Sequence, residues 1–208
     1  MKNKNEMLTE IADYYSGKLA EHGETARGVD WNGEGSQTLR FEQLCKVIDS
    51  ESQYSINDIG CGYGALYDYL NQRKDSVSYL GIDVSKDMVK AATDRFKDQE
   101  SARFIVSTAP DKIADYSVAS GVFNVRLNRT DAEWRVYLEE FLEVLDQSSS
   151  KGFSFNCLTS YSDKPKMHEY LYYADPCQIF DLCKRRYSKN VALLHDYNLY
   201  EFTILVRK

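Results

Sequence analysis

The sequence predicts an α/β fold built on a mostly parallel sheet, and three observations support this. Between residues 54 and 187, short apolar segments typical of strands alternate with segments of helical periodicity. Such alternation is typical of βαβ units, in which a helix connects two parallel strands. A glycine-rich segment, 60–64, joins the first strand to the helix after it. The last two strands are separated only by 196–199, and so short a connection requires them to be antiparallel.

The expected elements follow one another with short connections. The expected strands are 54–59, 77–82, 103–106, 116–121, 152–157, about 190–195 and about 200–207. The expected helices are 6–21, a second one capped by Ser36, 63–72, one capped by Ser85 that runs to Lys97, a long one that starts at Thr130 or Asp131, and one from Pro176 to Tyr187 that Asp175 caps. The sheet therefore follows a helical N-terminal segment.

Length and charge limit what the chain can do. Its 208 residues suit a single domain, 1–208, with one sizeable core. We expect 1–50 to form a helical cap and the tyrosine-rich 159–174 to be an insertion after the fifth strand. The net charge of −6 argues against a nucleic-acid partner, because such partners need a basic surface. No segment has the ~20 apolar residues that span a bilayer, so we expect no membrane association.

Cysteine and histidine usage favours a metal-free protein with reduced thiols. The chain has 5 cysteines, an odd number, and none of them forms a Cys-x-x-Cys pair. Because metal sites need clustered ligands, the scattered His22, His168 and His195 argue against one. The first residues, 1–7, lack the apolar run of an export signal. We therefore expect a cytoplasmic protein.

The sharpest motif is Asp58-Ile-Gly-Cys-Gly-Tyr-Gly64, placed between a strand and a helix. Glycines there let the backbone turn tightly and approach a ligand, and the following helix offers free N–H groups. Gly60 and Gly62 with Ala65 also satisfy the dinucleotide fingerprint, so a nicotinamide cofactor is one interpretation. Asp58 favours another cofactor, because its carboxylate suits a cationic amino acid better than a pyrophosphate.

Asp83 supports a nucleoside cofactor of either kind. It ends the second expected strand, in Leu80-Gly-Ile-Asp-Val84. An acidic residue at that place can accept hydrogen bonds from ribose hydroxyls. The glycine segment and Asp83 would meet at the carboxyl edge of the sheet, where open α/β folds bind their ligands.

Together, Asp58–Gly64, Asp83 and the closing strand pair resemble the class I S-adenosylmethionine-dependent methyltransferases. Further segments are similar to a small bacterial group of these enzymes without a settled substrate: 28–32, 156–161, 171–176, 195–197 and 199–203. The resemblance implies a Rossmann-like, seven-stranded sheet of order 3-2-1-4-5-7-6, with strand 7 antiparallel and helices on both faces. It also implies that S-adenosylmethionine is the cofactor, and that its methyl group passes to the acceptor by in-line displacement.

The resemblance assigns the cofactor site. The glycine segment is expected under the methionine and ribose, Asp83 at the ribose diol, and Met88 beside the adenine. Arg40 would pair with the methionine carboxylate. The full set of expected cofactor contacts is Tyr15, Trp31, Gln37, Arg40, Asp58, Gly60, Cys61, Gly62, Gly64, Asp83, Val84, Met88, Thr108, Ser120 and Gly121, with Asp111 an alternative to Thr108 at the adenine amine.

The acceptor site is expected beside the ends of the fourth and fifth strands. Catalytic candidates are Asn124, Asn156 and His195, although turn-forming asparagines and a hairpin histidine would look the same. Phe123, Tyr161, Tyr172 and Tyr173 are expected to contact the substrate, with 159–174 covering it. A hydroxyl acceptor would benefit from a general base and an amine acceptor would not, so O- and N-methylation both remain open.

Three functions from different classes follow from these patterns. The leading one is a methyltransferase that acts on a small-molecule acceptor, as a monomer or a homodimer. The second is a nicotinamide-dependent oxidoreductase, since the glycine spacing also fits that cofactor. The third is a non-catalytic, cofactor-binding partner subunit, because no obvious catalytic acid or base accompanies the motif.

Overall fold

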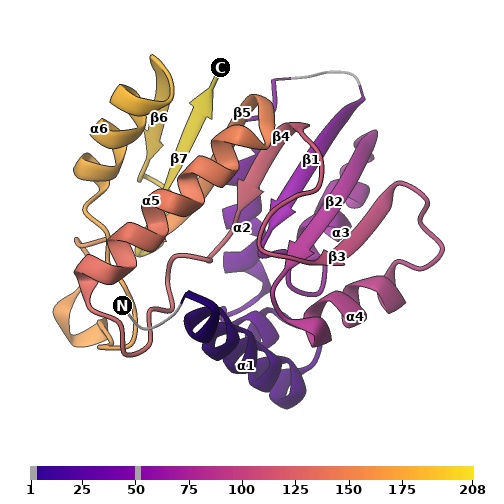
Figure 1. Ribbon diagram of the computed structural model, residues 1–208, viewed down its shortest axis with the longest axis horizontal. Helices are drawn as coiled ribbons and strands as arrows, with labels where there is room; N and C mark the ends of the chain where they lie inside the picture. The colour runs from indigo at the N-terminus through magenta and orange to yellow at the C-terminus, as the bar shows by residue number, and fades with distance from the viewer. Residues whose placement is uncertain (1–3, 50–52) are drawn as a thin grey trace.

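The computed structural model describes residues 4–49 and 53–208, and its sheet confirms the expected topology (Figure 1). The strand order is β3-β2-β1-β4-β5-β7-β6. The strands are β1 (Tyr54–Ile59), β2 (Val77–Asp83), β3 (Ala102–Val106), β4 (Ala114–Ala119), β5 (Ser149–Leu158), β6 (Asn190–Leu194) and β7 (Glu201–Arg207). The pairs among β1 to β5 are parallel, and β7 runs antiparallel to both β5 and β6.

Helices cover both faces of this sheet, as predicted. They are α1 (Lys4–His22), η1 (Ala26–Val29), α2 (Glu34–Cys45), α3 (Ala65–Gln72), α4 (Lys86–Arg95), α5 (Asp131–Gln147), η2 (Lys164–Lys166) and α6 (Pro176–Arg186). One apolar core joins α5 and α6 to one face, and a second joins α2 and α3 to the other. Because side chains alternate along a strand, Ile204 enters the first core and Leu205 the second.

The helix caps mostly follow the expected residues. The Ser85 hydroxyl accepts from the backbone N–H of Met88 at 3.1 Å, and Asp175 caps α6 ahead of Pro176. The expectation for Ser36 is wrong: α2 begins three residues earlier than a Ser36 cap implies, with Gly33 at the cap, and the Ser36 hydroxyl donates back to the Gly33 carbonyl. A serine within the first turn can satisfy a carbonyl in this way, so its presence marks the helix start only approximately.

Two features set the shape of the carboxyl edge of the sheet. The described residues 107–113, which connect β3 to β4, contain no helix. Instead α1 spans this edge: Lys4 pairs with Glu140 of α5 at 2.5 Å, and Ser16 hydrogen-bonds Ser85 before α4 at 2.9 Å. Of the helical cap expected over 1–50, α1 therefore lies across the ends of the parallel strands, whereas α2 packs on a face of the sheet.

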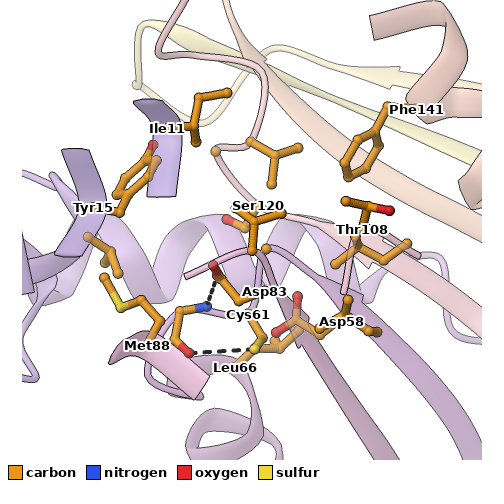
Figure 2. A pocket seen from close by; sticks show the side chains of 18 of the residues that line it. Ile11, Tyr15, Asp58, Cys61, Leu66, Asp83, Met88, Thr108, Ser120 and Phe141 are labelled. Carbon is orange, nitrogen blue, oxygen red and sulfur yellow. Dashed lines mark hydrogen bonds between the residues drawn. The ribbon is translucent and has the colours of Figure 1, made fainter. Parts of the chain in front are cut away.

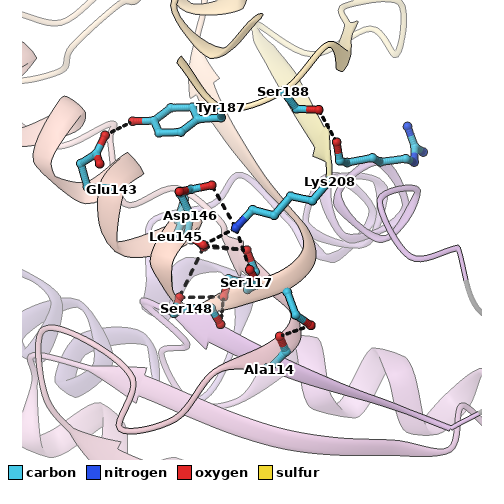
Figure 3. Close-up of polar contacts among 12 residues, drawn as sticks. Ala114, Ser117, Glu143, Leu145, Asp146, Ser148, Tyr187, Ser188 and Lys208 are labelled. Atoms are coloured by element: carbon cyan, nitrogen blue, oxygen red, sulfur yellow. Dashed lines mark hydrogen bonds and ion pairs between the residues drawn. The ribbon is translucent and has the colours of Figure 1, made fainter. Parts of the chain in front are cut away.

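The opposite, amino edge of β4 and β5 is closed by a polar network at the end of α5 (Figure 3). The hydroxyls of Ser117 and Ser148 lie 2.8 Å apart, and the C-terminal Lys208 pairs with Asp146 at 2.9 Å. Tyr187 donates to Glu143 at 2.7 Å, which ties the end of α6 to α5. These contacts join the end of α5 to β4, to α6 and to Lys208.

Candidate functional site

A pocket lies at the carboxyl ends of β1, β2 and β4, beneath α1 (Figure 2). Most residues that the sequence predicts as cofactor contacts line it: Tyr15, Trp31, Gln37, Asp58, Gly60, Cys61, Gly62, Asp83, Val84, Met88, Thr108, Ser120 and Gly121. Gly64 and Arg40 do not. The alternative adenine contact, Asp111, is exposed and pairs with Arg103 at 2.6 Å.

The glycine segment has a backbone that other residues would strain. Gly60 has a φ of +83°, and a Cβ atom on it would lie 2.2 Å from Cγ1 of Val122. Gly64 also has a positive φ, and it starts α3 rather than lining the pocket. A Cβ atom there would lie 2.7 Å from the Phe96 ring, so packing explains this third glycine.

Asp83 links the glycine segment to the start of α4. One carboxylate oxygen accepts from the Gly62 N–H at 2.9 Å, as Figure 2 shows, and the other accepts from the Ser85 N–H at 2.8 Å. Burial raises the pKa of this carboxyl, and these backbone hydrogen bonds oppose the rise. Each oxygen keeps a further lone pair, so the carboxylate can accept from a ligand in the pocket.

Asp58 lies in the wall of the pocket with its carboxyl fully enclosed. Burial raises its pKa to about 7, against a hydrogen bond from the Tyr79 hydroxyl that lowers it, and the nearby Asp83 carboxylate raises it further. The group is therefore part protonated at neutral pH. A cation placed beside it would favour the ionised form.

The pocket has an apolar section that the sequence did not suggest. It is lined by Leu8 and Ile11 of α1, and by Tyr137, Phe141 and Val144 of α5. Their helical spacing is typical of core positions, and the same spacing gives no sign of a ligand. These side chains reach the pocket because the described residues 107–113, which connect β3 to β4, form no helix that would cover it.

Arg40, expected at a cofactor carboxylate, binds a carboxylate of the protein instead. Its Nε and Nη2 donate to Glu201 at 2.7 and 2.8 Å, and its Nη1 donates to the Ser36 carbonyl at 2.8 Å. Its guanidinium lies over the ring of Trp31, 3.8 Å from the ring centre. Trp31 does line the pocket, so Arg40 reaches the site only through this ring.

The three expected catalytic residues lie outside the pocket lining. Asn156 is fully buried, and its side-chain oxygen accepts from the N–H of Gly121, a pocket residue, at 2.7 Å. The Asn124 side-chain oxygen accepts from the Leu158 N–H at 3.2 Å. His195 is exposed, with its ring 6.0 Å from that of Tyr161. The structure thus brings Asn156 next to the site and leaves His195 away from it.

The four expected substrate contacts also lie outside this lining. Phe123 is buried in the core against Phe141 and Phe155, and Tyr161 is largely exposed. Tyr172 is buried, and its backbone N–H donates to the Asn124 carbonyl at 2.8 Å. The Tyr173 hydroxyl accepts from the backbone N–H of His168 at 3.0 Å. The expected insertion, 159–174, is thereby fixed beside the residues that follow β4.

Other kinds of site find little support in the described parts of the chain. Among residues 4–49 and 53–208, no three His, Cys, Asp or Glu side chains are arranged to hold a metal ion. All 5 cysteines are free thiols, four of them buried. No helix within those ranges combines the length and apolar character that a membrane crossing needs.

Comparison with known proteins points to one family. Residues 56–148 match the family described as "Methyltransferase domain". A protein of Mycobacterium tuberculosis, provisionally named methyltransferase Rv1506c, is 61% identical over 163 residues, which cover 78% of this chain and 98% of that protein. The trans-aconitate 2-methyltransferase of Rhodopseudomonas palustris is 30% identical over 104 residues, which cover 46% of this chain and 40% of that enzyme.

Solved structures share the fold at low sequence identity. The DhpI-SAM-HEP complex has a TM-score of 0.71 at 12% identity, and the match covers 100% of both chains. The 1,6-didemethyltoxoflavin-N1-methyltransferase of Burkholderia thailandensis was solved with 1,6-didemethyltoxoflavin and S-adenosylhomocysteine bound. It has a TM-score of 0.65 at 15% identity, and the match covers 100% of this chain and 91% of that chain.

Proposed function

Because the chain belongs to the class I S-adenosylmethionine-dependent methyltransferases, we propose that its methyl acceptor is a small molecule. Two relatives act on small molecules by their names, trans-aconitate and 1,6-didemethyltoxoflavin. The net charge of −6 disfavours a nucleic-acid acceptor. Membership of this family indicates methyl transfer as the reaction, and it disfavours the nicotinamide interpretation of the glycine spacing.

One observation supports the cofactor assignment most strongly: Asp83 and the glycine segment meet in one pocket under α1. The residues present fit S-adenosylmethionine. The Asp83 carboxylate has lone pairs left for a ribose diol, and the backbone of Gly60 and Gly62 lines the pocket beside it. The buried hydroxyl of Ser120 has no partner among the described residues, so a ligand would give it one.

The cofactor, when bound, supplies a methyl group on a positively charged sulfur, which in-line displacement transfers. The residues of this chain would then bind the cofactor and orient it. Asp83 would accept hydrogen bonds from the ribose, and Asp58 would face the ammonium of the methionine part. Tyr15 and Trp31 would exclude water from the reacting centre, which strengthens these electrostatic interactions. Holding the two reactants in line provides most of the acceleration.

We further propose an acceptor whose nucleophile needs no general base. None of the histidines of the described chain lines the pocket, and its carboxylates are engaged: Asp58 and Asp83 would face the cofactor, and Glu140 is held in an ion pair. The amides expected at the acceptor, Asn124 and Asn156, can orient an acceptor but cannot take its proton. A neutral amine or a carboxylate oxygen meets this condition, so N-methylation and O-methylation of an acid both fit.

Transfer of a labelled methyl group tests this function. The protein is incubated with methyl-labelled S-adenosylmethionine and with separate low-mass and macromolecular fractions of a bacterial extract. After chromatographic separation from unreacted S-adenosylmethionine, we expect labelled product from the low-mass fraction only, and none when S-adenosylhomocysteine is added. Label in protein or RNA alone would overturn the small-molecule acceptor. Tight cofactor binding with no transfer to either fraction would instead support the non-catalytic partner subunit.

Cofactor binding is expected to depend on pH through Asp58. Its pKa of about 7 means that raising the pH from 6 to 7.5 ionises the carboxyl. An ammonium beside it favours the ionised form, so binding should tighten with rising pH, by up to roughly tenfold for each unit of pKa change. Titration calorimetry with S-adenosylhomocysteine over this range measures the affinity and the accompanying proton release.

The matched control is Asp58→Asn, which mimics the protonated acid and can still accept from the Tyr79 hydroxyl. Its affinity should be low and independent of pH over the same range. If the wild-type affinity is flat, or if Asp58→Asn keeps the wild-type slope, Asp58 does not face the ammonium.

A further inference from the structure

A buried ion pair lies behind the pocket wall, between α2 and the start of β7. Arg40 and Glu201 are joined by two hydrogen bonds of 2.7 and 2.8 Å. Their side chains are 7% and 1% exposed, so water does not screen the pair. The third contact of Arg40, to the Ser36 carbonyl, fixes the plane of the guanidinium. This planar cation therefore has one orientation.

Trp31 lies between this cation and the pocket. The guanidinium carbon of Arg40 is 3.8 Å from the centre of the Trp31 ring. On the pocket side the same ring approaches Gly121 so closely that a Cβ atom there would lie 2.4 Å from its Cζ2 atom. Trp31 and Gly121 both line the pocket, whereas Arg40 and Glu201 do not.

Gly121 is also held from its other side. Its N–H donates to the Asn156 side chain at 2.7 Å, and its φ of +77° suits glycine alone. The wall after β4 is thus fixed by Asn156, and the indole that lies against it is fixed by Arg40. A change in the direction of the indole would change the width of the pocket at this wall.

We propose that Arg40 and Glu201 are positioning residues for the cofactor, which act by stacking the Trp31 indole against Gly121. A flat guanidinium stacks on an aromatic face and pairs with a carboxylate at both nitrogens, and a lysine ammonium does neither. The inference rests on S-adenosylmethionine binding in this pocket and is independent of the acceptor. Without the stack, the indole is free to leave the wall and the cofactor loses an enclosing surface.

A double-mutant cycle on affinity for S-adenosylhomocysteine separates this role from a purely structural one. The variants are Arg40→Lys, Trp31→Ala and the two combined, each measured by titration calorimetry. We expect Arg40→Lys to weaken binding roughly tenfold, because an ammonium neither stacks flat on the indole nor pairs with Glu201 at two nitrogens. Trp31→Ala should weaken it at least as much, and adding Arg40→Lys to Trp31→Ala should cause no further loss. Equal effects of Arg40→Lys with and without Trp31 would overturn the proposal.

Fluorescence quenching gives a second readout, which reports the indole itself. The chain has 2 tryptophans, and Trp134 is 0% exposed, so iodide quenching reports Trp31. We expect Arg40→Lys to increase quenching of the free protein and to reduce the protection that S-adenosylhomocysteine gives. Unchanged quenching in the folded variant would contradict the positioning role.

The controls distinguish the possible failures. Arg186 is another arginine that pairs with a carboxylate, Glu143 at 2.8 Å, and lies over an aromatic ring, that of Tyr187. It lies outside the pocket, so Arg186→Lys should leave the affinity for S-adenosylhomocysteine unchanged. If Arg40→Lys does not fold, Glu201→Gln replaces it, because it loosens the same guanidinium without removing it. Wild type that fails to bind S-adenosylhomocysteine would overturn the cofactor site itself. Wild-type affinity in a folded Arg40→Lys or Glu201→Gln variant would overturn only this inference.

Discussion

Replacing Asp83 by alanine should abolish measurable binding of S-adenosylhomocysteine. The carboxylate is buried, and in the proposed site its remaining lone pairs would accept from both ribose hydroxyls. Hydrogen bonds to a charged group contribute about 1.5–3 kcal/mol each, so losing two weakens binding at least a hundredfold. The same change also removes the contact that holds the Gly62 N–H, which loosens the glycine segment and adds to the loss.

The thermal shift with added S-adenosylhomocysteine measures this effect, since a ligand that binds only the folded state raises the melting temperature. Asp111→Ala is the matched control, because Asp111 follows the neighbouring strand, lies exposed and pairs with Arg103. It should keep the full shift. A normal shift for Asp83→Ala, or an equal loss for both variants, would remove Asp83 from the site.

Replacing Glu201 by alanine should lower the free energy of unfolding by about 3–5 kcal/mol. The substitution leaves the Arg40 charge buried without its carboxylate, since the Arg40 side chain is only 7% exposed. Removing one partner of such a pair costs far more than the pair itself contributes, because the remaining charge loses its compensation. Urea unfolding followed by circular dichroism provides the measurement.

Two comparisons make this result specific. Asp94→Ala breaks a surface pair between Asp94 and Lys90, whose side chains are 66% and 75% exposed, and should leave the free energy of unfolding almost unchanged. The combined change Arg40→Met with Glu201→Leu should restore most of the stability, because apolar residues of similar volume can replace a buried pair. It should not restore cofactor affinity. A loss below about 1 kcal/mol for Glu201→Ala would contradict the account of the pair.

Local sequence patterns were enough to predict most of the fold. The alternation of apolar segments placed every strand to within a few residues, and the short 196–199 connection predicted the antiparallel pair. Boundaries were less certain where local chemistry allowed two starts, as at Gly33 and Ser36. The order of the strands came from the resemblance, since no local pattern specifies which parallel strands are neighbours.

Pocket residues were predictable where a short local motif identifies them. The glycine segment does so between a strand and a helix, and Asp83 does so at the end of a strand. Long-range pairings were not predictable: Arg40 and Glu201 are 161 positions apart, and a lone arginine on a helix gives no sign of its partner. The apolar section of the pocket was not predicted for a similar reason, since Ile11 and Phe141 have the spacing of ordinary core residues.

The expected acceptor residues illustrate the same limit. Asn156 lies near the carboxyl end of its strand, where open α/β sheets bind ligands, and its side chain accepts from the N–H of the pocket residue Gly121. His195 and Tyr161 lie near each other on the surface instead, and only the packing of distant elements decides this. Whether 159–174 covers the acceptor therefore stays a prediction.

Calorimetric titration of the wild-type protein with S-adenosylmethionine, and separately with NAD, decides which cofactor the pocket binds. We expect one S-adenosylmethionine site per chain and no heat of binding for NAD. S-adenosylhomocysteine should compete for the same site. Binding of NAD in place of S-adenosylmethionine, or binding of neither, would contradict the assignment of the pocket formed by Asp83 and the glycine segment.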